Sequence, residues 1–168
     1  ATWFFLGALL QFSTIDVSNA LKPTSPADFT GPKPVYTWLT WFDGITMGIA
    51  EIFFQDNWVT GILILIGIAI NTRIGALMAL MGSTLAVAGA VFYGAHDEAI
   101  RDGLFGYNAA LTAMALGGMF YVLTLPAFLY TVIGVLITAR VWASLGVFLE
   151  PTGMPVLTSA FVFVTWLM

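Results

Sequence analysis

Cysteine is absent from this chain of 168 residues, and charged residues make up only 8% of it. The lack of cysteine excludes disulfide frameworks, thiol nucleophiles and Cys-ligated metals. Because a soluble domain carries about 25% charged residues, the low charge excludes an ordinary water-soluble globule. Lysine and arginine together number 5 and form no basic stripe, so nucleic acid is not an expected partner.

Motifs of catalysis are also missing from the sequence. It contains no H-E-x-x-H, no G-x-S-x-G and no glycine-rich loop for phosphate, so we expect no enzyme activity. His96 is the single histidine, and no cysteine accompanies it. We therefore expect neither a metal site nor a cofactor.

The sequence is rich in long apolar runs, and 60% of its residues are hydrophobic. A helix needs about 20 apolar residues to cross a bilayer. The clearest run is Ile74 to Tyr93, with Gly82, Ala86 and Ala90 at the four-residue spacing that lets helices approach closely. A second run, Pro126 to Leu149, contains Arg140, which we expect to snorkel or to pair with a carboxylate.

Two other runs carry interruptions. Gln55 to Asn57 divides Gly44 to Ile70 into two half-length pieces, and Leu104 to Leu125 opens with glycine and asparagine, so it is predicted to be broken or re-entrant. Counting all segments gives four or five spans plus one or two half-helices, with a charged loop at His96 to Gly103. The predicted class is an all-α polytopic membrane protein.

The two ends of the chain echo each other, because Thr2-Trp3 and Thr165-Trp166 each precede bulky apolar residues. This echo favours the later half of a duplicated protein, an architecture that is usual in transporters. Residues 1–12 are then the end of the closing helix of a preceding repeat. Residues 13–43, which hold four prolines, form a Pro-rich surface linker, and residues 44–168 form the second transmembrane repeat.

Polar residues inside the apolar runs are candidates for function. Glu51 is costly at membrane depth unless it faces a cavity or the protein interior; alternatively it lies near the interface and reaches water. Asp56 and Asn57 both suit the N-cap of a helix that begins near Val59, and we expect Asp56 to serve as a cap. Thr158 follows the Met154-Pro155 break and either faces a pore or bonds to helix backbone.

Aromatic residues near these breaks offer a second kind of site. Two parallel rings form a slot for a flat polar solute, while oxygens around the slot accept its N–H donors. Phe54, Tyr107 and Phe161 are candidates, although each ring also suits lipid or core. Beside Tyr107, Asn108 can cap a short helix or bond exposed carbonyls. A plain helix start with Tyr107 at the interface is the alternative.

Four motifs in order resemble the second half of a urea transporter: Glu51-Ile52-Phe53-Phe54-Gln55-Asp56-Asn57-Trp58-Val59-Thr60-Gly61, Gly103-Leu104-Phe105-Gly106-Tyr107-Asn108-Ala109-Ala110-Leu111, Gly117-Gly118-Met119-Phe120 and Gly153-Met154-Pro155-Val156-Leu157-Thr158. The resemblance implies half of an inverted-repeat transporter fold, with spanning helices plus a short re-entrant helix. It also implies a homotrimer in the lipid bilayer, with one pore per protomer between this half and the other half of the fold.

Polar roles implied by the resemblance fall on two residues. Glu51 accepts a hydrogen bond from the urea amide, and Thr158 offers its hydroxyl at the mid-membrane constriction.

Apolar roles implied by the resemblance fall on four more residues. Ile52 lines the narrow waist, Phe54 forms an aromatic slot, and the pair of Tyr107 and Leu111 flanks the solute.

The predicted function is selective, passive permeation of urea across a cell membrane, either a bacterial inner membrane or a plasma membrane. A channel for another small amide or for ammonia would share the fold. A proton-coupled transporter would use Glu51 as its proton carrier. A membrane scaffold that transports nothing is the third alternative.

Overall fold

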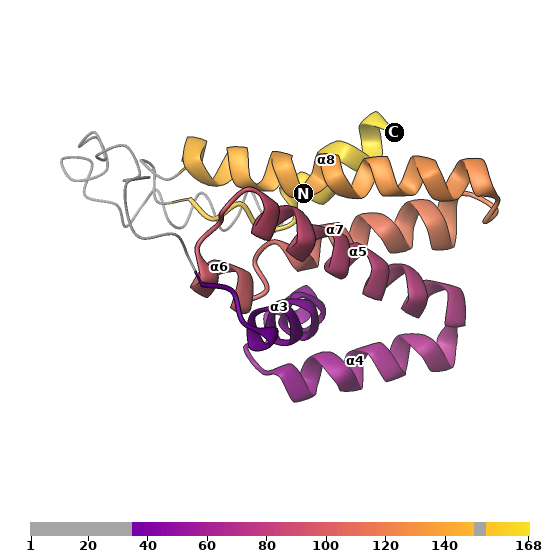
Figure 1. The fold of residues 1–168 in the computed structure, drawn as a ribbon. Helices are drawn as coiled ribbons and strands as arrows, with labels where there is room; N and C mark the ends of the chain where they lie inside the picture. The colour runs from indigo at the N-terminus through magenta and orange to yellow at the C-terminus, as the bar shows by residue number, and fades with distance from the viewer. Residues whose placement is uncertain (1–34, 150–153) are drawn as a thin grey trace.

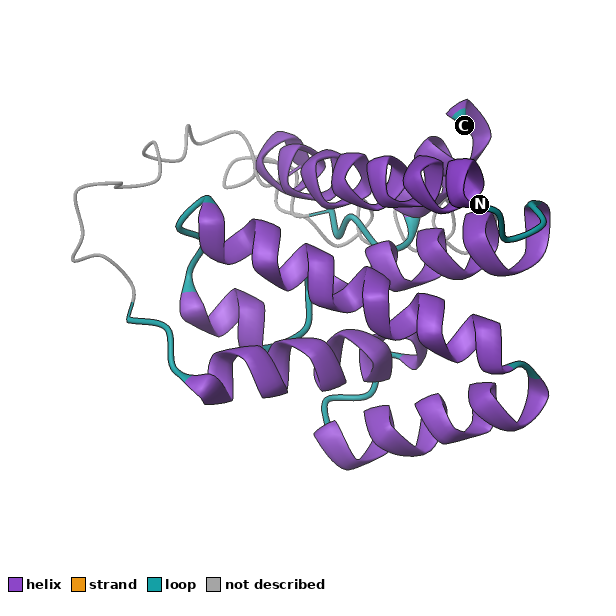
Figure 2. Cartoon of the chain, turned by 45° about the vertical axis from the view of Figure 1, so that its right-hand side comes forward, coloured by secondary structure: helices purple, strands orange, loops and turns teal. Residues whose placement is uncertain are grey.

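The computed structural model describes residues 35–149 and 154–168, and every regular element in these ranges is helical (Figures 1 and 2). The expected helix end at 1–12 lies outside the described residues. In chain order the elements are α3 (Trp38–Ala50), η1 (Glu51–Phe53), α4 (Trp58–Asn71), α5 (Arg73–Phe92), α6 (Asp97–Arg101), α7 (Gly106–Met114), η2 (Ala115–Phe120), α8 (Leu125–Leu149) and α9 (Ser159–Leu167).

Two described helices, α5 and α8, are long and apolar enough to cross a membrane. The pair formed by α3–η1 and α4 would make a third span, but it bends by 70° at residues 54–57, which confirms the predicted interruption. Within the described ranges the sequence-based count of four or five spans is therefore too high. The apolar run after residue 104 is shortened because α7 passes into the π-helical turn η2 and ends at Phe120, and α9 has only 9 residues.

Helices α5, α7 and α8 lie side by side, with α7 antiparallel to the other two (Figure 1). Short connections enforce this order, since residues 93–105, which include α6, join α5 to α7, and residues 121–124 join η2 to α8. Helix α3 packs against α5 and α7 on the other side, and α4 packs against α3 and α5. The first turn of α7 is consequently surrounded by helices.

Small residues allow these helices to approach closely. The predicted stripe of Gly82, Ala86 and Ala90 is buried on α5, as expected. A Cβ atom built at Gly82 would lie 2.5 Å from the Ala109 carbonyl oxygen of α7, and one built at Gly61 would overlap the Thr46 carbonyl oxygen of α3. Side chains larger than hydrogen at these glycines would push the helices apart.

Polar contacts fix the start of α3 to the segment around α6. Thr40, which is fully buried, donates to the Asp97 carboxylate at 2.5 Å, and Arg101 forms an ion pair with Asp43 at 2.8 Å. Helix α3 therefore begins at Trp38, so the predicted linker boundary at residue 43 falls inside a helix. The predicted charged loop contains the short helix α6.

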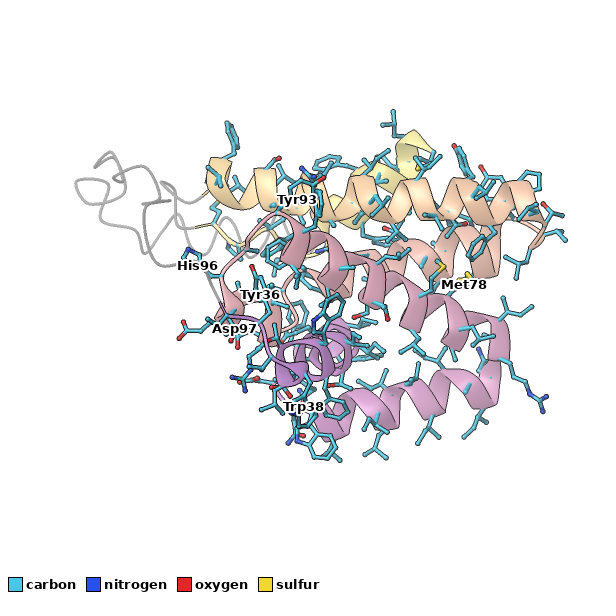
Figure 3. The ribbon with its side chains drawn as sticks, in the orientation of Figure 1. Tyr36, Trp38, Met78, Tyr93, His96 and Asp97 are labelled. Atoms are coloured by element: carbon cyan, nitrogen blue, oxygen red, sulfur yellow. The ribbon has the colours of Figure 1, made fainter. Side chains whose placement is uncertain are left out.

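Tyr36, close to Asp97 in Figure 3, donates its hydroxyl to the Ala95 carbonyl oxygen at 2.8 Å. Partial burial, and then the nearby Asp97 carboxylate, raise the pKa of Tyr36 above its ordinary value of 10.0. The protonated form is the one that the fold favours, so this stabilisation is present at neutral pH and is lost as the pH rises through the raised pKa. Tyr36→Phe is expected to lower the free energy of unfolding by about 1 kcal/mol at pH 8.

In strong alkali the difference between Tyr36→Phe and the parent is expected to disappear, because the ionised phenol can no longer donate. Thermal unfolding of both proteins in detergent at the two pH values checks this. A difference that persists in alkali would contradict the contact.

Arg140 lies over the ring of Tyr93, with its guanidinium carbon 3.2 Å from the ring centroid. Tyr93 follows the last residue of α5, and Figure 3 shows it reaching toward α8. Of the two alternatives for Arg140, pairing with a carboxylate is wrong for the described part of the chain, where the ion pair joins Arg101 and Asp43 instead. A cation over an aromatic face takes its place.

Candidate functional site

The first turn of α7 is the point at which two distant segments meet. A Cβ atom built at Gly48 of α3 would lie 2.8 Å from the Cα atom of Gly106, so these backbones touch. From the other side, the Tyr107 hydroxyl and the Asn108 Nδ2 atom both donate to the Leu157 carbonyl oxygen, at 2.6 and 2.9 Å. The end of α3 and the start of α9 therefore converge on α7.

Both converging segments carry a break in the helical backbone. Phe54 has φ 54° and Leu157 has φ 48°, and they are the non-glycine residues with positive φ in the described ranges. A left-handed conformation at such residues costs of order 1–3 kcal/mol and is found mainly at functional sites. Non-helical backbone at membrane depth is tolerated only where it is buried in protein or lines a watery cavity.

Oxygen atoms without partners accompany these breaks. Glu51 follows Gly48 by three residues, so both lie on the side of the chain that faces α7. The Glu51 carboxylate is partly exposed and makes no hydrogen bond or ion pair with the described residues. The Thr158 hydroxyl, directly after Leu157, is also partly exposed and also makes none. Two polar groups are thus available to a solute.

The apolar candidate residues differ in how much of each side chain is exposed. Ile52 lies in η1, which contacts α7, and Leu111 lies one helical turn after Tyr107; both are partly exposed. The Phe54 ring is 62% exposed, whereas Tyr107 is only 6% exposed. Neither ring pairs with another aromatic ring of the described residues. A two-ring slot would need its second ring from elsewhere.

The Tyr107 hydroxyl is directed into the protein. It accepts a hydrogen bond from Trp142 Nε1 at 3.1 Å while donating to Leu157. Sequence reasoning missed Trp142, because an isolated tryptophan in an apolar helix carries no signal of its partner.

Asn108 caps a helix, as its residue type suggests, but that helix is α9, where its partner lies 53 residues later in the chain. Its Oδ1 atom accepts from the Phe161 backbone N–H at 3.0 Å. At the other break, Asn57 caps α4 and accepts from the Val59 N–H at 2.9 Å, so of the two candidate caps Asn57 is confirmed and the expectation for Asp56 is wrong.

Acidic groups gather near the break after η1. Partial desolvation, followed by the charges of Asp56 and Glu98, raises the pKa of Asp102, while Arg101 lowers it. These influences place Asp102, just before α7, within electrostatic reach of the 54–57 break. The surroundings of the site therefore carry negative charge.

A sequence model of the family described as urea transporter matches residues 1–168 of this chain. The chain belongs to the urea transporter family. Urea transporter 1 of Rattus norvegicus is 29% identical over 168 residues, which cover 97% of this chain and 42% of the rat protein. Urea transporter 1 of Ovis aries is 28% identical over 161 residues, covering 91% of this chain and 42% of the sheep protein.

Membership in the urea transporter family confirms the resemblance predicted from the four motifs. Proteins of this family are not enzymes, and this member is a membrane protein with candidate spans in α5 and α8. It spans about two fifths of the length of the urea transporters that it matches, since the matched share of each is 42%.

Proposed function

We propose that this chain supplies half of a channel through which urea crosses a cell membrane down its gradient. The observation that carries the proposal is that η1, which directly precedes one backbone break, and Leu157, at the other break, both contact α7, and that each of these two segments holds an oxygen that has no partner. These oxygens belong to Glu51 and Thr158. Family membership supports urea as the solute.

Urea is planar and presents N–H donors on two sides and one carbonyl acceptor. A carboxylate accepts hydrogen bonds only, which suits the N–H groups, while a threonine hydroxyl both donates and accepts. Such groups replace the water that urea loses on entering a narrow passage. In this proposal Ile52 and Leu111 set the width, the exposed Phe54 ring contacts one flat face of the solute, and Tyr107 flanks the solute through the small part of its ring that stays accessible.

The pore is proposed to be closed by a second half of the transporter fold in each protomer of a homotrimer. The 62% exposure of Phe54 supports a facing wall, and so does the 42% share of the relatives that the chain covers. Large apolar side chains on α4 are also exposed, as a bilayer or a neighbouring segment requires: Leu63, Ile66 and Ile70. The proposed location is a bacterial inner membrane or a plasma membrane.

Urea entry into liposomes tests the proposal. The longest native form of the protein is reconstituted, and shrinkage and re-swelling in a urea gradient are followed by light scattering, with glycerol as the size-matched control solute. Fast, saturable urea entry without glycerol entry is expected. Equal entry of both solutes, or no entry through folded and fully assembled protein, would overturn the proposal.

A further inference from the structure

The first turn of α9 has an unusual source for its cap. The first N–H groups of a helix lack acceptors within the helix, and a Ser, Thr, Asp or Asn at the N-cap normally supplies one to the second or third residue. Thr158 occupies the N-cap of α9 and is of the right type, yet it makes no cap hydrogen bond. Its ψ of 14° differs from the extended value of ordinary caps, such as 120° at Asn57.

Asn108 of α7 supplies the missing acceptor. Phe161, the third residue of α9, donates to Asn108 Oδ1 at 3.0 Å. Asn108 is fully buried, and its Nδ2 atom donates to the Leu157 carbonyl oxygen at 2.9 Å. The amide thus bonds both sides of the turn that contains Thr158.

The Leu157 carbonyl is held from two directions. Tyr107 donates to the same oxygen at 2.6 Å, so both of its lone pairs are used. This carbonyl belongs to the peptide that joins Leu157 to Thr158, and its fixed plane sets the position of the Thr158 backbone. It also maintains Leu157 in its left-handed conformation, with φ 48°.

We propose that Asn108 is a positioning residue for Thr158, capping α9 from a neighbouring helix so that the Thr158 hydroxyl stays free for the solute. This inference rests on the proposed function. Without Asn108, the free Phe161 N–H attracts the nearest oxygen, which is the Thr158 hydroxyl in the ordinary capping arrangement. The helix would then keep a cap, and the passage would lose a hydrogen-bonding group.

Thr158→Val in the full-length protein is the first test. Its Tm is expected to stay unchanged, because no cap is lost, while urea flux falls about three- to tenfold, the effect of one neutral hydrogen bond. A lowered Tm would show that the hydroxyl caps α9 and would overturn the inference.

A double-mutant cycle with Asn108→Ala is the second test. On urea flux, the effects of Asn108→Ala and Thr158→Val are expected not to add, since both remove the same hydroxyl from the passage. On Tm, the double variant is expected to lose more than the sum of the single variants, because neither cap remains. Additive effects on flux would overturn the inference.

Thr138→Val is the matched control, because Thr138 is fully buried and bonds only to Gly134 and Thr112 within the helix pair. It is expected to lower Tm without changing urea flux. If Asn108→Ala does not fold, the Tm of Thr158→Val still decides whether the Thr158 hydroxyl caps α9. If the parent protein carries no urea, the proposed function fails, whereas the Tm measurements still test the cap.

Discussion

Alanine at Gly103 is expected to destabilise the protein by about 3 kcal/mol or more, combining left-handed strain with a backbone overlap. Gly103 has φ 73°, a conformation that side chains rarely adopt. A Cβ atom there would overlap the Gly48 nitrogen and the Met47 carbonyl carbon of α3. Because these are backbone atoms, α3 would have to move away from α7. Thermal unfolding of the longest native form in detergent measures the loss.

Gly94→Ala provides a matched control for this substitution. Gly94 has nearly the same φ, 74°, but a Cβ atom there meets nothing within 4 Å. Its variant carries the left-handed strain alone and is expected to lose about 1–2 kcal/mol. Equal losses at the two positions would mean that α3 does not pack against Gly103.

Loss of the Glu51 carboxylate is expected to reduce urea flux about 10- to 100-fold in Glu51→Ala, the range for a hydrogen bond to a charged group. Glu51→Gln is expected to retain most of the flux, since its amide oxygen still accepts a hydrogen bond. Light scattering of reconstituted liposomes measures both variants, with Glu98→Gln as the control because Glu98 is an exposed acid on α6.

The same pair of variants separates a channel from a proton-coupled transporter. A transporter that carries its proton on Glu51 would lose transport in Glu51→Gln as completely as in Glu51→Ala. Transport by Glu51→Gln at near-parental rates, with no dependence on a proton gradient, is the result expected of a channel.

Sequence reasoning predicted the long spans well, because an uninterrupted apolar run has no competing signal. Helix α5 spans Arg73–Phe92, within one residue of the predicted run at each end, and α8 begins one residue before the predicted Pro126. The start of α3 was less predictable. Composition placed it after residue 43, whereas Thr40 is helical and bonds to Asp97, 57 residues away.

The sequence pointed to candidate site residues, but it did not predict the hydrogen bonds that hold the site together. Polar residues in apolar runs drew attention to Glu51 and Thr158, and the structure leaves the oxygens of both without partners. The bonds from Asn108 to Phe161 and from Trp142 to Tyr107 join residues 53 and 35 positions apart. Such separations depend on how the helices pack, and no local pattern encodes them. Their roles in urea passage stay predictions.

The contacts at the start of α3 have a consequence for how the protein is made. Tyr36, Thr40 and Asp43 find their partners 59, 57 and 58 residues later in the chain, respectively. At about 5–20 residues per second, the ribosome delivers those partners roughly 3–12 seconds after α3 has been synthesised. During that interval the buried hydroxyl of Thr40 has no carboxylate to bond. Helix α3 therefore gains its final anchorage only once α6 has left the ribosome.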